Sequence, residues 1–94
     1  MSRMYLNRNF QKQVLIKALA EEPDFGAWLT MKRLMHDLTS RELANKIHMT
    51  KQTVSNLETG RTKLTFGVVA ACCYVFGDGD DPEEIYQKYL GEKL

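Results

Sequence analysis

The sequence predicts an all-α fold, a single domain of about six short helices. The chain has 94 residues, the usual length of one domain. Its apolar share is 44% and its charged share 27%, ordinary globular values that argue against a disordered or fibrous chain. Apolar side chains recur at helical spacing between capping residues, and no useful stretch alternates with the period of a strand. These observations favour a compact helical bundle over residues 1–94.

The first two predicted helices are separated by a proline. Residues 5–20 have the pattern of an amphipathic helix, with an apolar stripe formed by Phe10, Val14, Leu15, Ala18 and Leu19. Pro23 ends this helix, since proline cannot continue one, and Asp24 is a good N-cap for the next. The second helix is predicted over residues 25–36, with five apolar side chains for a core: Phe25, Trp28, Leu29, Met31 and Met35.

Two short helices follow, joined by a very short turn. Thr39 and Glu42 have the spacing of a capping box, so a third helix is predicted to begin there. Thr50 offers an N-cap for a fourth helix, which Gly60 closes in the left-handed conformation. The apolar edges of this pair are Leu43, Ala44, Ile47, Val54 and Leu57.

A threonine and a proline mark the last two helices. Thr65 can cap a helix over residues 66–76, which a loop over residues 77–80 follows. Asp81 and Pro82 then start a final helix over residues 82–92 with acidic residues in its first turn. This acidic cluster is only loosely similar to a calcium loop, because its glycine and closing glutamate are out of place. A capped helix start is therefore the favoured interpretation.

Several functional classes are disfavoured by the composition. The longest uncharged apolar run, residues 64–76, is too short to cross a bilayer, and no signal peptide is visible, so a cytoplasmic protein is expected. Cys72 and Cys73 are adjacent and lack zinc-site spacing, which favours reduced core thiols and no metal. His36 and His48 are too isolated to suggest a base or a ligand. No cofactor is expected, and no constellation suggests an enzyme.

The net charge is only +1, but it is unevenly distributed along the chain. Residues 38–76 carry five basic residues against two acidic ones. Residues 77–94 carry two basic residues against six acidic ones. The middle of the chain is therefore expected to attract a polyanion, and the C-terminal end is expected to repel it.

Residues 40–59 have the sequence form of a helix-turn-helix, in which the second helix enters the major groove of DNA. Val54 and Leu57 point inward in this arrangement. The outer side then carries side chains that can form hydrogen bonds with base edges: Lys51, Gln52, Ser55 and Asn56. On an arbitrary helix such residues would most often be a solvated surface, and the surrounding pattern is what favours DNA recognition.

At these positions the chain resembles the phage-repressor and Cro type (XRE) family of helix-turn-helix proteins. The likeness covers residues 25–77 and rests on residues 38–44, Thr50, Val54, Ser55, Leu57, Glu58 and Gly60. It implies a helical bundle of the phage-repressor DNA-binding type, with an extra helix within residues 1–22 and a further one over residues 82–92. It also implies a homodimer on double-stranded DNA with a palindromic operator, usually acting as a transcriptional repressor.

The resemblance also assigns roles by position. Arg33 and Glu58 match a family pair that forms a salt bridge, although they could be two unrelated surface charges. Six residues fall where the family touches the DNA backbone: Ser40, Arg41, Thr53, Thr59, Arg61 and Lys63. Ser40 stands where glutamine is common, so its phosphate contact would be shorter, water-mediated or absent. His48 stands where glycine is common in the turn, which implies some strain in left-handed geometry.

The terminal helices have apolar side chains without an assigned partner, and one of them is expected to form a dimer interface. The C-terminal helix is favoured, because interface cores are rich in aromatic residues, through Ile85, Tyr86, Tyr89 and Leu90. The N-terminal helix is the second choice. Arg3 and Arg8 could also follow a DNA backbone or enter a minor groove, against a simple frayed end. A second function stays open, that of an antitoxin or phage accessory protein that mainly binds a protein partner.

Overall fold

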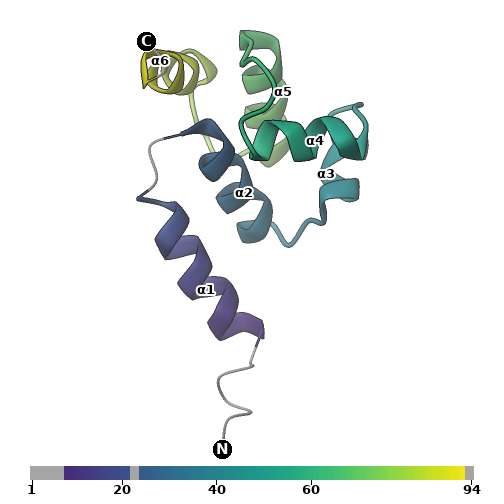
Figure 1. The fold of residues 1–94 in the computed structure, drawn as a ribbon, viewed down its shortest axis with the longest axis vertical. Coiled ribbons are helices and arrows are strands. Elements are labelled where there is room, and N and C mark those ends of the chain that lie inside the picture. The colour runs from purple at the N-terminus through teal and green to yellow at the C-terminus, as the bar shows by residue number, and fades with distance from the viewer. Residues whose placement is uncertain (1–7, 22–23, 93–94) are drawn as a thin grey trace, which may run out of the picture.

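The structure is a computed structural model that describes residues 8–21 and 24–92, and this part of the chain contains six helices and no strand. Figure 1 shows these helices as α1 (Arg8–Leu19), α2 (Phe25–Met35), α3 (Ser40–Lys46), α4 (Lys51–Glu58), α5 (Phe66–Phe76) and α6 (Pro82–Glu92). The all-α prediction is confirmed. Arg3 and the side chain of Arg8, the proposed DNA-binding arm, lie outside the described part. No described helix is long and apolar enough to cross a membrane.

The predicted capping residues begin four of the helices. Asp24 accepts a hydrogen bond from the backbone amide three residues later at 2.8 Å. Thr39 and Glu42 form the reciprocal capping box, with bonds of 3.1 and 2.8 Å. Thr50 and Thr65 cap α4 and α5 through their hydroxyl groups. Each cap satisfies a backbone donor that has no partner within its helix, so local sequence determines where these helices begin.

Several helices are followed by a residue whose backbone has the left-handed conformation. His48 has a φ of 59° in the joint between α3 and α4, the conformation that the sequence predicted for this turn. Gly60, with a φ of 78°, follows α4 as predicted, and Gly77, with a φ of 62°, follows α5. Asp37 has a φ of 58° shortly after α2, which the sequence analysis did not anticipate. Aspartate is among the residues that tolerate this region best, so the chain can turn sharply from α2 toward α3.

The core lies between α2, α3, α4 and α5. Its fully buried large side chains are Leu29, Leu43, Val54, Val69 and Cys72. Aromatic rings extend this core at one end, where the Trp28 ring lies 5.3 Å from Phe25 and 6.1 Å from Phe76, centroid to centroid. Tyr89 of α6 joins the same cluster, with its ring 6.0 Å from that of Phe25. Helix α6 therefore closes the core of the monomer.

Helix α1 lies outside this core and runs beside α2 (Figure 1). Lys12 forms an ion pair with Asp37, just beyond the end of α2. The described side chains of α1 that are partly buried are Lys12, Ile16 and Leu19. Val14 and Leu15, which belong to the apolar stripe seen in the sequence, are instead 54% and 47% exposed. The side of α1 that packs on α2 is thus centred on Ile16. Most of the apolar stripe predicted from the sequence is exposed instead.

Candidate nucleic-acid interface

Helices α3 and α4 share one buried side across the joint formed by residues 47–50. The buried side chains belong to a single hydrophobic cluster and are Leu43, Ala44, Ile47, Val54 and Leu57. The backbone amide of Met49 donates to the carbonyl oxygen of Ala44 at 2.9 Å, which closes the joint tightly after α3. Because the inner side of α4 is fixed in this way, its opposite side is directed to solvent.

The end of α4 is held against α2 by a very close approach of two backbones. Gly26 lies in the first turn of α2 and faces the last residues of α4. A Cβ atom at this position would lie 2.3 Å from the carbonyl oxygen of Glu58, far inside normal contact distance. The packing therefore requires glycine here, and it fixes the position of α4 relative to α2.

Arg33 and Glu58 form a bidentate ion pair between α2 and the end of α4. The Nε and Nη2 atoms of Arg33 donate to the two carboxylate oxygens of Glu58 at 2.7 and 3.2 Å. The Nη1 atom of Arg33 donates to the carbonyl oxygen of Leu38 at 3.0 Å. The two charged side chains are only 16% and 12% exposed. One guanidinium group thus fixes both the end of α4 and the segment that leads into α3.

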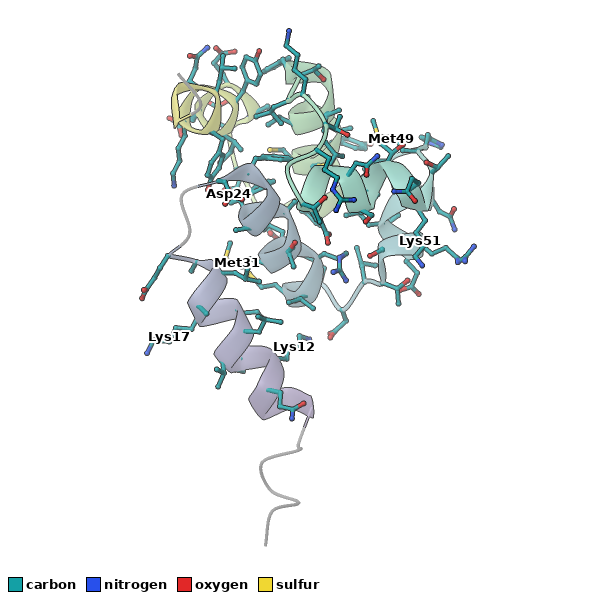
Figure 2. All side chains as sticks on the ribbon, in the orientation of Figure 1. Lys12, Lys17, Asp24, Met31, Met49 and Lys51 are labelled. Carbon is teal, nitrogen blue, oxygen red and sulfur yellow. The ribbon has the colours of Figure 1, made fainter. Side chains whose placement is uncertain are left out.

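The four residues with a predicted base-reading role lie together on the outer side of α4. Lys51 and Gln52 are exposed, and Ser55 and Asn56, one turn later, are partly exposed. Figure 2 shows Lys51 at the far side of the molecule from α1. The Nε2 atom of Gln52 donates to the Oδ1 atom of Asn56 at 3.1 Å. The two amide side chains therefore already form a connected pair without DNA.

The six residues predicted to contact the DNA backbone lie on α3, on α4 or in the segment that follows α4, and all are at least partly exposed. Arg41, Thr59, Arg61 and Lys63 are exposed, and Ser40 and Thr53 are partly exposed. The Thr53 hydroxyl lies 2.9 Å from that of Thr50. The Thr59 hydroxyl donates to the carbonyl oxygen of Ser55 at 2.9 Å. Both hydroxyl groups are therefore engaged within the protein, and the arginine and lysine side chains are better placed to donate to phosphate.

The segment from α3 to the loop after α4 is more positively charged than the net charge of the chain suggests. Five exposed cations surround α3, α4 and the following loop, and none forms an ion pair within the described residues: Arg41, Lys46, Lys51, Arg61 and Lys63. The two acidic residues of this region are engaged elsewhere, Glu58 with Arg33 and Glu42 with the backbone of Thr39. The cations are thus available to attract a phosphate backbone.

A protein-family model described as helix-turn-helix matches residues 29–77, slightly more than half of the chain. The chain belongs to the XRE-type helix-turn-helix family. The match spans α3, the joint and α4, together with most of α2 and all of α5. This XRE-type protein is accordingly a DNA-binding protein of the transcription-regulator kind. In comparisons with curated proteins and with solved structures, no match to the chain was found.

In this XRE-type protein the acidic C-terminal segment is tied to α2 by a charge cluster that the sequence analysis missed. The Nζ atom of Lys32 lies 2.8 Å from Asp78 and 2.7 Å from Asp80. The Nε2 atom of His36 lies 2.9 Å from Asp78. Lys32 and His36 are four residues apart on one side of α2, a spacing that could have indicated a shared acidic partner.

The charge cluster has a clear electrostatic consequence. Burial opposes the charge of Lys32, but its hydrogen bonds and attraction to the two aspartates raise the pKa of Lys32 overall. The hydrogen bond from His36, followed by that from Lys32, lowers the pKa of Asp78. The Asp78 carboxylate therefore stays ionised and directed at α2. Figure 1 places the neighbouring helix α6 on the opposite side of the body from α3, so the acidic helix lies away from the cations of α3.

The four residues proposed for a dimer interface are used largely within the monomer. Tyr89 is 4% exposed and belongs to the aromatic cluster. Ile85 and Tyr86 are partly buried and pack against the core, and Leu90 is also partly buried. The sequence showed their apolar character but not their direction, because the rings that Tyr89 contacts, Phe25 and Trp28 of α2, are far away along the chain.

Cysteine and histidine residues form no metal site among the described residues. Burial raises the pKa of the Cys72 thiol to about 12, so this group stays protonated. Burial also raises the pKa of the neighbouring Cys73. Both are free thiols in the core, at the positions where the sequence analysis expected core thiols.

Proposed function

We propose that this protein is a cytoplasmic, sequence-specific regulator that represses transcription by binding a palindromic operator as a homodimer. The observation that carries the proposal is the outer side of α4, where hydrogen-bonding side chains lie among cations that have no ion-pair partner in the described structure. The side chains at Lys51, Gln52, Ser55 and Asn56 would discriminate between bases. The surrounding cations would supply an affinity that falls steeply as salt increases.

The pair formed by Gln52 and Asn56 suggests which base it would bind. The bond between the two amides leaves the Oε1 atom of Gln52 as an acceptor and the amide hydrogens of Asn56 as donors. Adenine presents the complementary pattern in the major groove, an N6 donor beside an N7 acceptor. Lys51 suits the O6 and N7 acceptors of guanine. We therefore expect an adenine and a guanine near each other in every half-site.

The first test is selection of bound duplexes from a random DNA pool by the purified protein at about 150 mM salt, a physiological ionic strength. A two-fold symmetric motif with half-site centres about one helical turn apart is the expected result. Binding without an enriched motif, or no binding at this salt, would overturn the proposal of a dimeric sequence reader.

Single variants then separate base contacts from phosphate contacts. Gln52→Ala should relax the preference at one base pair of each half-site, at a cost of about 1–3 kcal/mol on the preferred sequence only. Arg61→Ala should weaken binding to all sequences and reduce the dependence on salt. Gln87→Ala is a matched control, because Gln87 forms a similar bond with Glu83 on the acidic helix α6. Equal weakening by Gln52→Ala on every duplex would contradict the assigned base contact.

A second candidate function is that of an antitoxin or phage accessory protein that mainly binds a protein partner. The exposed aliphatic side chains of α1 are the observation that favours it. Isolation of a stable complex with a different, identified protein, combined with no selected DNA motif, would support this function over the first. A homodimer that selects an operator by itself would count against it.

A further inference from the structure

The outer side of α4 carries two side-chain amides that are hydrogen-bonded to each other in the free protein. The Nε2 atom of Gln52 donates to the Oδ1 atom of Asn56, one helical turn away, at 3.1 Å. Gln52 is exposed and Asn56 is partly exposed, so the polar atoms that this bond leaves over can reach a bound molecule. We call these two side chains the amide pair. Its hydrogen-bonding pattern is set before any ligand arrives.

The amide pair offers one free carbonyl oxygen beside one free amino group. In the arrangement described, the Oε1 atom of Gln52 is the free acceptor and the amino group of Asn56 is the free donor. If both amides turned over, Asn56 would donate to Gln52, and the free oxygen and the free amino group would exchange places. The internal bond therefore keeps an acceptor next to a donor in either arrangement.

The complement of this pattern in the major groove is adenine, and the match depends on a single hydrogen atom of the base. Adenine presents its N6 amino group as a donor beside the N7 acceptor. Pairing with thymine uses one N6 hydrogen, and the other hydrogen faces the major groove. A methyl group on N6 must take the major-groove position if the base pair is to be kept. The methylated base therefore has no N6 donor for the amide pair.

Methylation would also leave the acceptor of the amide pair without a partner. Its free carbonyl oxygen would face a methyl group and would lose water without gaining a hydrogen bond, which is unfavourable. A site built to bond a polar group rejects an analogue that lacks this group for the same reason. The O6 and N7 acceptors of guanine, which suit Lys51, and the DNA phosphates are unchanged by the modification. The loss should therefore be confined to the amide pair.

We propose that this protein discriminates against DNA methylated at adenine N6, so that methylation of its operator releases it. The ligand of the amide pair is an unmodified adenine in each half-site, and the methylation state of that adenine regulates binding. The inference rests on the proposed function, because it concerns the same surface of α4. It goes further in one respect, since a sequence reader that places no acceptor at N6 would bind both forms of the operator equally.

Parallel selections from two random DNA pools test the proposal before any operator is known. One pool contains ordinary adenine, and the other contains N6-methyladenine at every adenine position. The first pool should yield a motif with an adenine in each half-site, and the second should yield no motif with methyladenine at that position. The same motif from both pools would overturn the proposal and preserve the proposed function. No motif from either pool would overturn the proposed function and this inference with it.

Titrations of the selected operator then assign the effect to the amide pair. Methylation of the one adenine whose preference Gln52→Ala relaxes should weaken binding of the unsubstituted protein by about tenfold for each half-site. Gln52→Ala should bind the methylated and unmethylated operators equally. Gln87→Ala is the control and should keep the full discrimination, because Gln87 forms its similar bond with Glu83 on α6.

Two outcomes of these titrations would overturn the proposal. The first is an equal loss for the unsubstituted protein and for Gln52→Ala, which would show that the methyl group acts through the shape of the DNA. The second is a relaxed position in Gln52→Ala that is not an adenine. Either outcome leaves the selected operator, and with it the proposed function, in place.

Discussion

Helices α4 and α1 are both short, yet they are attached to the molecule in very different ways. Helix α4 has 8 residues and buries Val54 and Leu57 almost completely. It is also fixed by the ion pair from Arg33 and by the close approach of Gly26. Helix α1 has 12 residues, but its described side chains include none that is fully buried. The longer helix is therefore the less firmly attached one.

This difference shows that tertiary contacts, more than helix length, determine how firmly a short helix is held. Isolated helices of this size are marginal in water, so both depend on contacts with the rest of the chain. For α4 those contacts come from two other helices and hold the predicted DNA-reading side chains in place. For α1 they come mainly from one side of α2. We expect substitutions at matched positions in the two regions to have very unequal effects.

The largest expected effect is that of Gly26→Ala. The new Cβ atom would meet the backbone of α4 at 2.3 Å, which only a backbone shift can relieve. We expect a loss of about 3 kcal/mol in the free energy of unfolding, measured by urea denaturation. Gly67→Ala is the control, because no atom lies within 4 Å of its Cβ position in α5. It should stabilise the protein by about 0.5–1 kcal/mol. Equal effects at both positions would contradict the close packing of α2 and α4.

The second comparison uses one residue type in the two helices. Val54→Ala removes two methyl groups from a fully buried site in α4 and should cost about 2 kcal/mol of unfolding free energy. Val14→Ala acts at a position that is 54% exposed in α1 and should change stability by less than about 0.5 kcal/mol. Thermal unfolding followed by circular dichroism measures both. A large loss from Val14→Ala in the monomer would show that α1 is more deeply packed than described.

The third comparison concerns the two ion pairs. Arg33→Met leaves the carboxylate of Glu58 largely buried without its partner, so we expect a loss of about 1.5 kcal/mol. Lys12→Met removes the partner of Asp37, which is 78% exposed and remains solvated. That change should cost less than about 0.5 kcal/mol. In a double-mutant cycle, Glu58→Gln should couple strongly to Arg33→Met; additive effects would contradict a direct ion pair.

The smallest expected effect is that of pH on the bridge from Asp78 to Lys32 and His36. Because the pKa of Asp78 in the folded protein lies below its ordinary value of 3.8, the bridge contributes fully above pH 3.8. This contribution is lost as the pH falls through the lowered pKa. Asp78→Asn should cost less than about 1 kcal/mol at neutral pH and should flatten the fall in stability between pH 4 and pH 2. Urea denaturation across this range measures the slope. An unchanged slope would exclude Asp78 as its source.

Most of the fold was predictable because local sequence determines where its helices begin. Asp24, Thr39, Thr50 and Thr65 act on backbone amides three residues away, so their effect is visible within a few positions of the chain. The outer side of α4 was predictable for a similar reason. Once Val54 faces inward, the helical repeat decides which neighbouring side chains face solvent.

The features that escaped prediction depend on residues that are distant in the sequence. Position 26 must be glycine because the backbone of Glu58 lies against it. Lys32 can be buried because aspartates in the loop after α5 pair with its charge. Tyr89 is of a residue type that is common in interfaces, yet it packs into an aromatic cluster with α2. The orientation of α1 was equally hidden, because an apolar stripe does not show which side of a helix another segment will occupy.

The buried Cys72 thiol gives the molecule a built-in chemical reporter. The thiolate form of cysteine is the nucleophile that attacks thiol reagents, and a side chain that is 0% exposed with a pKa raised to about 12 presents almost no thiolate. Reaction must therefore wait until the core opens around α5. The rate of labelling would record how often the helix-turn-helix core opens, and it would be insensitive to fraying of α1 alone. Mass measurements over time could thus follow the opening of the core through a native thiol, with no engineered residue.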